Sequence, residues 1–78
     1  MTRMTRLNIK IYGIVQGVGF RPFVSRLATA HSIRGSVCNK GPYVEVLAEG
    51  TEKDLKDFRQ GLRTEAPERA AILKIDTQ

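Results

Sequence analysis

Residues 15–21 read Val-Gln-Gly-Val-Gly-Phe-Arg and lie between a strand-like run and a helix-like run. Glycines at such a junction let successive backbone N–H groups point at one anion, with the positive end of a helix dipole behind them. An arginine at the mouth of the helix adds a planar fork of donors that matches phosphate oxygens. We therefore predict a phosphate-binding loop of six residues: Gln16, Gly17, Val18, Gly19, Phe20 and Arg21.

The common phosphate-binding motifs do not match this loop. The Rossmann pattern would need a glycine where Pro22 stands, and the Gly-Lys-Ser/Thr of a P-loop is missing. From spacing alone, an ordinary strand–helix turn explains the residues equally well, because glycine is the default residue of tight turns. Arg21 would then be a solvated residue of the first helical turn.

A longer set of residues resembles the acylphosphatase family. It consists of Gly13-x-Val15-Gln16-Gly17-Val18-Gly19-Phe20-Arg21, then Gly35-x-Val37-x-Asn39, then Val44-Glu45-Val46 and Glu49-Gly50. The resemblance runs from about residue 7 to residue 76. Within the family, three segments are similar to the N-terminal domain of hydrogenase-maturation carbamoyltransferases: Arg21-Pro22-Phe23-Val24, Val37-Cys38-Asn39 and Ala66–Ile72. Free-standing acylphosphatases more often have a large aromatic residue where this chain has Ser36.

This resemblance implies hydrolysis of small acyl phosphates, with Arg21 and Asn39 as the catalytic residues. Asn39 would hold the attacking water, and an amide can do so without repelling a phosphate dianion. An asparagine is no general base near neutral pH, so the proton of the water would pass to the substrate. A carboxylate is a good leaving group, and we therefore expect no metal and no cofactor. Without Arg21 and its loop, Asn39 would read as a turn residue before Lys40-Gly41-Pro42.

For the maturation branch, the resemblance implies carbamoyl phosphate as the substrate and carbamate as a product passed to further domains of a larger protein. Those domains would bind zinc, form carbamoyl adenylate and deliver a cyanide precursor for the nickel–iron hydrogenase. The expected partners of this chain are a small acyl phosphate and inorganic phosphate, with no nucleic acid and no membrane.

Other reactive side chains have plainer interpretations. His31 is the only histidine, and it lies a whole helix away from the predicted loop, so we expect no catalytic role. Strand alternation points Cys38 to the sheet face opposite Asn39, which favours a small structural residue over a nucleophile. Four carboxylates show no metal-ligand spacing and are predicted to form a solvated surface: Glu45, Glu49, Asp54 and Asp57.

Hydrophobic periodicity predicts the order β-α-β-β-α-β. Alternation predicts strands at Leu7–Tyr12, Ser36–Lys40, Tyr43–Glu49 and Ala71–Asp76, and 3.6-residue spacing predicts helices at 22–31 and after Thr51. Thr51 with Asp54 forms a variant capping box. This order is typical of an α+β, ferredoxin-like sandwich, an antiparallel sheet with both helices on one face.

The composition restricts the possible functions less than the motifs do. Seventy-eight residues with a net charge of +5 suit one small domain (1–78) with an anionic ligand, although basic domains are common. One cysteine excludes an internal disulfide and favours a reducing cytoplasm. Two other functions fit the same fold: an RNA-binding module, which the few aromatic residues disfavour, and a non-catalytic phosphate-binding or interaction domain.

The sequence also allows predictions for the two ends of the chain. The basic leader 1–6 is predicted to be loose. The family resembled has one more strand after the last one predicted here, and that strand pairs beside the strand that carries the asparagine. We therefore expect the edge strand at 36–40 to be open, and weak self-association through this edge.

Overall fold

The computed structural model describes residues 3–15 and 19–78. Its elements follow the predicted order. They are β1 (Thr5–Ile14), α1 (Phe20–Ala30), β2 (Arg34–Asn39), β3 (Tyr43–Gly50), α2 (Glu52–Thr64) and β4 (Ala71–Thr77).

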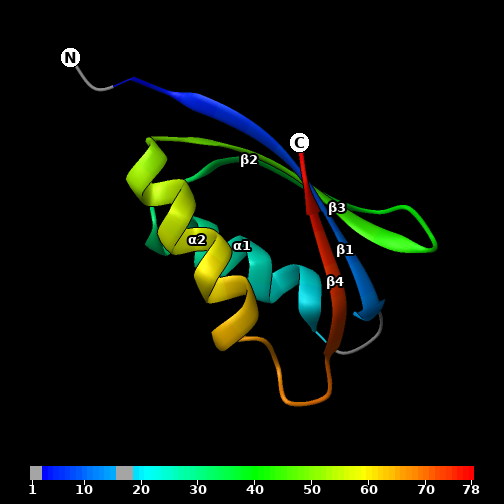
Figure 1. The fold of residues 1–78 in the computed structure, drawn as a ribbon. Helices are drawn as coiled ribbons and strands as arrows, with labels where there is room; N and C mark the ends of the chain where they lie inside the picture. Colours follow the sequence, from blue (N-terminus) through cyan, green and yellow to red (C-terminus); the bar gives the residue numbers. More distant parts are fainter. Residues whose placement is uncertain (1–2, 16–18) are drawn as a thin grey trace.

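The strands form one sheet in the order β2-β3-β1-β4, and all neighbours are antiparallel. The central strand β1 pairs with both β3 and β4, so that Ile11 faces Val44 on one side and Ile75 on the other. Both helices cover the same face of the sheet (Figure 1). The prediction of a ferredoxin-like sandwich is confirmed.

The core lies between this sheet face and the two helices. Each central strand buries every second side chain, as Ile9 and Ile11 do in β1. Each helix buries one stripe, which includes Phe23 in α1 and Phe58 in α2. The buried apolar side chains form one cluster: Ile9, Ile11, Val15, Phe20, Phe23, Val24, Leu27, Ile33, Val44, Val46, Ala48, Leu55, Phe58 and Leu62.

The N-terminal strand begins earlier than predicted. β1 starts at Thr5, so the last two residues of the expected leader belong to the sheet. Arg6 pairs across the strands with Glu49, and its Nε donates a hydrogen bond of 2.7 Å to Glu49 Oε2. That hydrogen bond and the charge of the carboxylate raise the pKa of Arg6.

The predicted alternation of the last strand is wrong at Leu73. The register of β1 and β4 shifts between Tyr12 and Gly13, which face Lys74 and Ile72 respectively. Leu73 therefore lies in a bulge and is 81% exposed, while Ile72 packs against the core. Gly13 allows this arrangement because it has a φ of 136° and because a Cβ there would collide with the carbonyl oxygen of Ala71.

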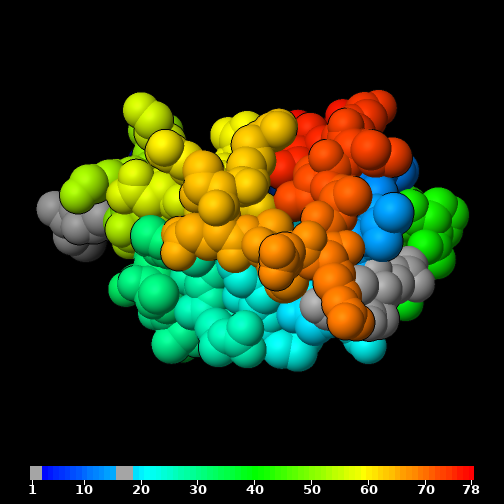
Figure 2. Space-filling view, turned by 90° about the horizontal axis from the view of Figure 1, so that it is seen from below, coloured from blue at the N-terminus to red at the C-terminus, as the bar shows by residue number. Residues whose placement is uncertain are grey.

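Helix α2 begins as predicted, with the Thr51 side chain accepting a 3.1 Å hydrogen bond from the backbone N–H of Asp54. Seen from below, α1 and α2 lie side by side, and the connection from α2 to β4 (orange) crosses this end of the molecule (Figure 2). Neither helix of the described chain has the length and apolar character needed to cross a membrane.

Candidate active site

A small pocket lies where the end of β2 meets the start of α1. Its volume is about 250 Å³. The buried side chains of Val15, Phe20 and Val44 contribute apolar lining, and none of the three is more than 2% exposed. The described residues that complete the lining are Gly19, Arg21, Pro22 and Asn39.

The start of α1 gives this pocket a positive character. Gly19 is the N-cap and takes a left-handed conformation with a φ of 76°, which glycine adopts without strain. The first intrahelical hydrogen bond described is the one that Phe23 N–H donates to Gly19 O, at 3.2 Å. The N–H groups of the first turn have no partners within a helix, and Pro22 lacks one altogether. No acidic side chain lies in this turn, so the helix end is suited to an anion.

Arg21 is exposed at the second helical position and lines the pocket. Among the described residues that line the pocket it is the only charged one. No ion pair joins Arg21 to another residue in the described part of the chain. Its guanidinium is therefore not neutralised by a neighbouring carboxylate there, as a clamp for phosphate requires.

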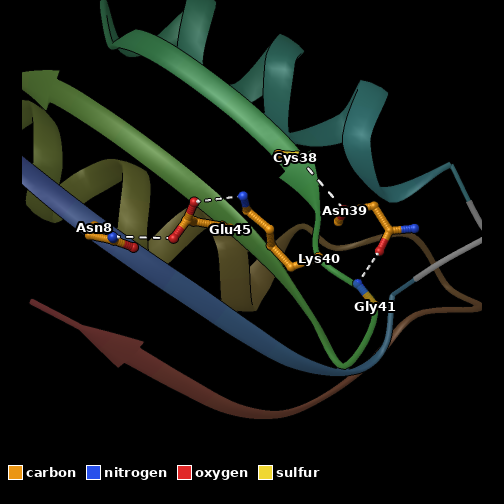
Figure 3. A network of polar contacts seen from close by, with 6 residues as sticks. All are labelled: Asn8, Cys38, Asn39, Lys40, Gly41 and Glu45. Atoms are coloured by element: carbon orange, nitrogen blue, oxygen red, sulfur yellow. Dashed lines mark hydrogen bonds and ion pairs between the residues drawn. The ribbon is translucent and has the colours of Figure 1, made fainter.

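Asn39 is the last residue of β2 and faces Val44 in the register with β3. Its side-chain oxygen accepts a 2.8 Å hydrogen bond from the backbone N–H of Gly41 (Figure 3). The bond closes an Asx turn at the start of the β2–β3 hairpin loop. The neighbouring bond from Lys40 N–H to Tyr43 O, 2.9 Å long, closes the hairpin itself.

The predicted site residues thus have two outcomes. The structure brings Gly19, Phe20, Arg21 and Asn39 to one pocket, although Arg21 and Asn39 come from different elements. The remaining members of the predicted loop, residues 16–18, lie outside the described residues.

The reactive residues for which the sequence predicted no catalytic role do not line this pocket. His31 caps the other end of α1. Cys38 is exposed and does not line the pocket. Glu45 and Glu49 bind neighbouring side chains on the sheet surface. Within residues 3–15 and 19–78, no three His, Cys, Asp or Glu side chains are grouped closely enough to hold a metal ion.

Two contributions to the pocket were not foreseen from the sequence. One is the apolar lining by Val15 and Val44, two residues of the family motif for which the sequence predicted no role in the pocket. The other is Gly41, which holds the Asn39 side chain. The segment Asn39-Lys40-Gly41-Pro42 carries a signal for it, because an asparagine two residues before a glycine commonly forms an Asx turn.

Comparison of the sequence with known proteins identifies the family of this chain. The sequence model described as acylphosphatase matches residues 7–78. The chain is 45% identical over 73 residues to a probable carbamoyltransferase HypF from Methanocaldococcus jannaschii, covering 94% of this chain and 10% of that protein. It is 42% identical over 59 residues to an acylphosphatase from Staphylococcus aureus, covering 76% of this chain and 66% of that enzyme. The chain therefore spans about a tenth of the length of the HypF protein.

Solved structures agree with these relatives. A full-length HypF in a phosphate- and nucleotide-bound form superposes with a TM-score of 0.97 at 35% identity, over 100% of this chain and 10% of that one. The acylphosphatase from Bacillus subtilis superposes with a TM-score of 0.88 at 31% identity, over 97% of this chain and 83% of that one. With this match in sequence and in fold, the chain belongs to the acylphosphatase family.

Proposed function

We propose that this chain hydrolyses small acyl phosphates to a carboxylate and inorganic phosphate. The observation that carries the proposal is the meeting of Arg21 and the Asn39 amide in one pocket at the start of a helix. Phosphoryl transfer mainly requires positioning and electrostatic stabilisation of the phosphoryl oxygens. Arg21 and the helix N-terminus supply the stabilisation, and Asn39 supplies a group that positions water.

The reaction proceeds in one displacement. The water oxygen forms a bond to phosphorus while the bond from phosphorus to the bridging oxygen breaks. The carboxylate leaves with the electron pair of that bond. One proton of the water passes to a phosphoryl oxygen of the substrate, so a dianionic acyl phosphate and water give a carboxylate and dihydrogen phosphate. No protein group has to take up the proton, and the proposed reaction is independent of metal ions.

Carbamoyl phosphate is the substrate that the relatives favour. Two of the matched proteins are carbamoyltransferases, from Methanocaldococcus jannaschii and Cupriavidus necator. The volume of about 250 Å³ is below the roughly 300–1,000 Å³ of pockets for drug-sized ligands, which favours so small a molecule. We place this activity in the cytoplasm, within a larger hydrogenase-maturation protein whose other domains use the product.

Phosphate release tests the proposal directly. We expect turnover of acetyl phosphate and carbamoyl phosphate, unchanged by EDTA, and none of p-nitrophenyl phosphate, whose phenolate is a poorer leaving group. The variant Arg21→Ala is the matched control for contaminating phosphatases. A preparation that binds inorganic phosphate but turns over neither acyl phosphate would instead be the non-catalytic phosphate-binding domain that the fold also allows. Loss of activity in EDTA would contradict the metal-independent mechanism.

A further inference from the structure

The Asn39 amide has an oxygen end and a nitrogen end, and among residues 3–15 and 19–78 a hydrogen-bond partner is found for the oxygen alone. Its oxygen accepts the 2.8 Å hydrogen bond from Gly41 N–H. Since a backbone N–H is only a donor, this bond fixes which end of the amide is the oxygen. The amide nitrogen then points away from Gly41, on the side of the molecule where α1 begins (Figure 3).

We infer that Gly41 is a positioning residue that makes Asn39 a hydrogen-bond donor in the active site. The inference rests on the proposed function, and it adds which partner donates the hydrogen bond between Asn39 and the water. With its oxygen held by Gly41, Asn39 presents Nδ2–H to the pocket. The water oxygen accepts that hydrogen bond and keeps both of its own hydrogens. One of these is then available to a phosphoryl oxygen, as the displacement requires.

The backbone of Gly41 explains why a glycine stands there. Its φ is 98°, a conformation that side chains with a Cβ rarely adopt. Nothing lies within 4 Å of the position that a Cβ would occupy, so glycine is favoured here by the backbone conformation and not by steric crowding. A substitution therefore strains the turn locally, and because residue 41 is exposed it leaves the core intact.

Two variants at residue 41 test the positioning role. We expect Gly41→Val to lower kcat for acetyl phosphate by about 10- to 100-fold with little change in KM, because a misplaced catalytic group loses rate more than binding. Gly41→Asn should lose clearly less, since asparagine tolerates a positive φ far better than a β-branched residue. Equal kcat values for wild type and Gly41→Val would overturn the inference, and so would a loss that appears mainly in KM.

A third variant, Asn39→Asp, tests the polarity. A carboxylate can still accept from Gly41 N–H, but it offers the water no hydrogen. We expect kcat at about pH 7 to be as low as in Asn39→Ala. Relative to wild type at the same pH, kcat should recover severalfold towards about pH 4, where the acid regains an O–H donor. Arg21 is the only charged group among the described residues that line the pocket. Wild-type kcat in Asn39→Asp at about pH 7 would show that residue 39 acts as an acceptor, and would overturn the inference.

One measurement separates this inference from the proposed function. In the unliganded protein, NMR should detect a scalar coupling across the hydrogen bond between the Gly41 amide nitrogen and the Asn39 side-chain carbonyl carbon. A wild-type protein that shows the coupling but turns over no acyl phosphate would refute the function and leave the amide orientation standing. An active wild-type protein without the coupling would refute the inference alone.

Discussion

Arg21 and Asn39 divide the proposed work between holding a phosphate and holding a water. They lie on different elements, and a local backbone conformation positions each of them. Arg21 follows a left-handed Gly19 at the first turn of α1, and Asn39 ends β2 in an Asx turn with Gly41. Substitutions at the two positions should therefore fail in different ways.

We predict that Arg21→Lys loses about 100-fold in kcat/KM for acetyl phosphate. A lysine keeps the charge but cannot offer two parallel N–H groups to phosphate oxygens, and removal of one such donor costs on this order. Arg26→Lys is the matched control, because Arg26 is exposed on the same helix but does not line the pocket. Steady-state kinetics that show equal losses in both variants would remove Arg21 from the site.

For Asn39→Ala we expect a large fall in kcat and little change in the inhibition constant of inorganic phosphate. This variant removes a contact with the water and leaves the phosphate contacts in place. Steady-state kinetics with phosphate as a competitive inhibitor measure both quantities. If phosphate inhibition weakens as much as kcat falls, Asn39 belongs to the binding site.

At the scale of the elements, strand alternation predicts β1 and β3 well and β4 poorly. The pattern of Ile9 and Ile11 is local and survives in the structure. The bulge at Leu73 depends on how Gly13 meets a strand some sixty residues later, and the residues of β4 alone do not encode that register.

The candidate site shows the same limit. From its own neighbourhood Arg21 could be a phosphate ligand or a solvated residue of an ordinary turn. Its meeting with Asn39 depends on the packing of α1 against β2. From the sequence, only the resemblance to a family placed Arg21 and Asn39 in the same site. The hold of Gly41 on Asn39 depends on one side-chain rotamer, which sequence spacing allows but does not require.

The bulge in β4 leads to a stability prediction. We expect Leu73→Ala to change the free energy of unfolding by less than about 0.5 kcal/mol, as at other exposed positions. Ile75→Ala, two residues on, should cost about 1 to 2 kcal/mol because Ile75 packs against the core. Urea denaturation of the two variants makes the comparison. A larger cost at Leu73 would show that its side chain is buried in solution.

At the scale of the whole molecule, a ligand at the pocket should stabilise the fold. Inorganic phosphate at ten times its Kd adds about 1.4 kcal/mol to the free energy of unfolding. In a chain of this size that raises Tm by several degrees. Differential scanning calorimetry measures the shift against sodium chloride at the same ionic strength. The shift should vanish in Arg21→Ala, and a wild-type Tm indifferent to phosphate would count against the pocket as an anion site.

The open edge of the sheet gives a prediction about association. β2 lies at the edge, and no other strand of the described chain pairs with its outer side. We expect weak self-association at high concentration through this edge. Ser36→Lys, in the middle of β2, should reduce it, whereas Gln60→Lys, an exposed position on α2, adds the same charge and should not. Sedimentation velocity distinguishes the two, and equal effects would assign the association to another surface.

The central place of β1 also has a consequence for how the chain is made. During synthesis β1 leaves the ribosome first, but its two sheet partners follow much later: Ile11 must wait for Val44 and then for Ile75. At about 5–20 residues per second, the second of these delays is roughly 3 to 13 seconds. For that time an inner strand of the sheet, with the buried side chains of Ile9 and Ile11, has an unpaired side. A nascent chain of this design therefore offers chaperones a binding segment until nearly all 78 residues have emerged.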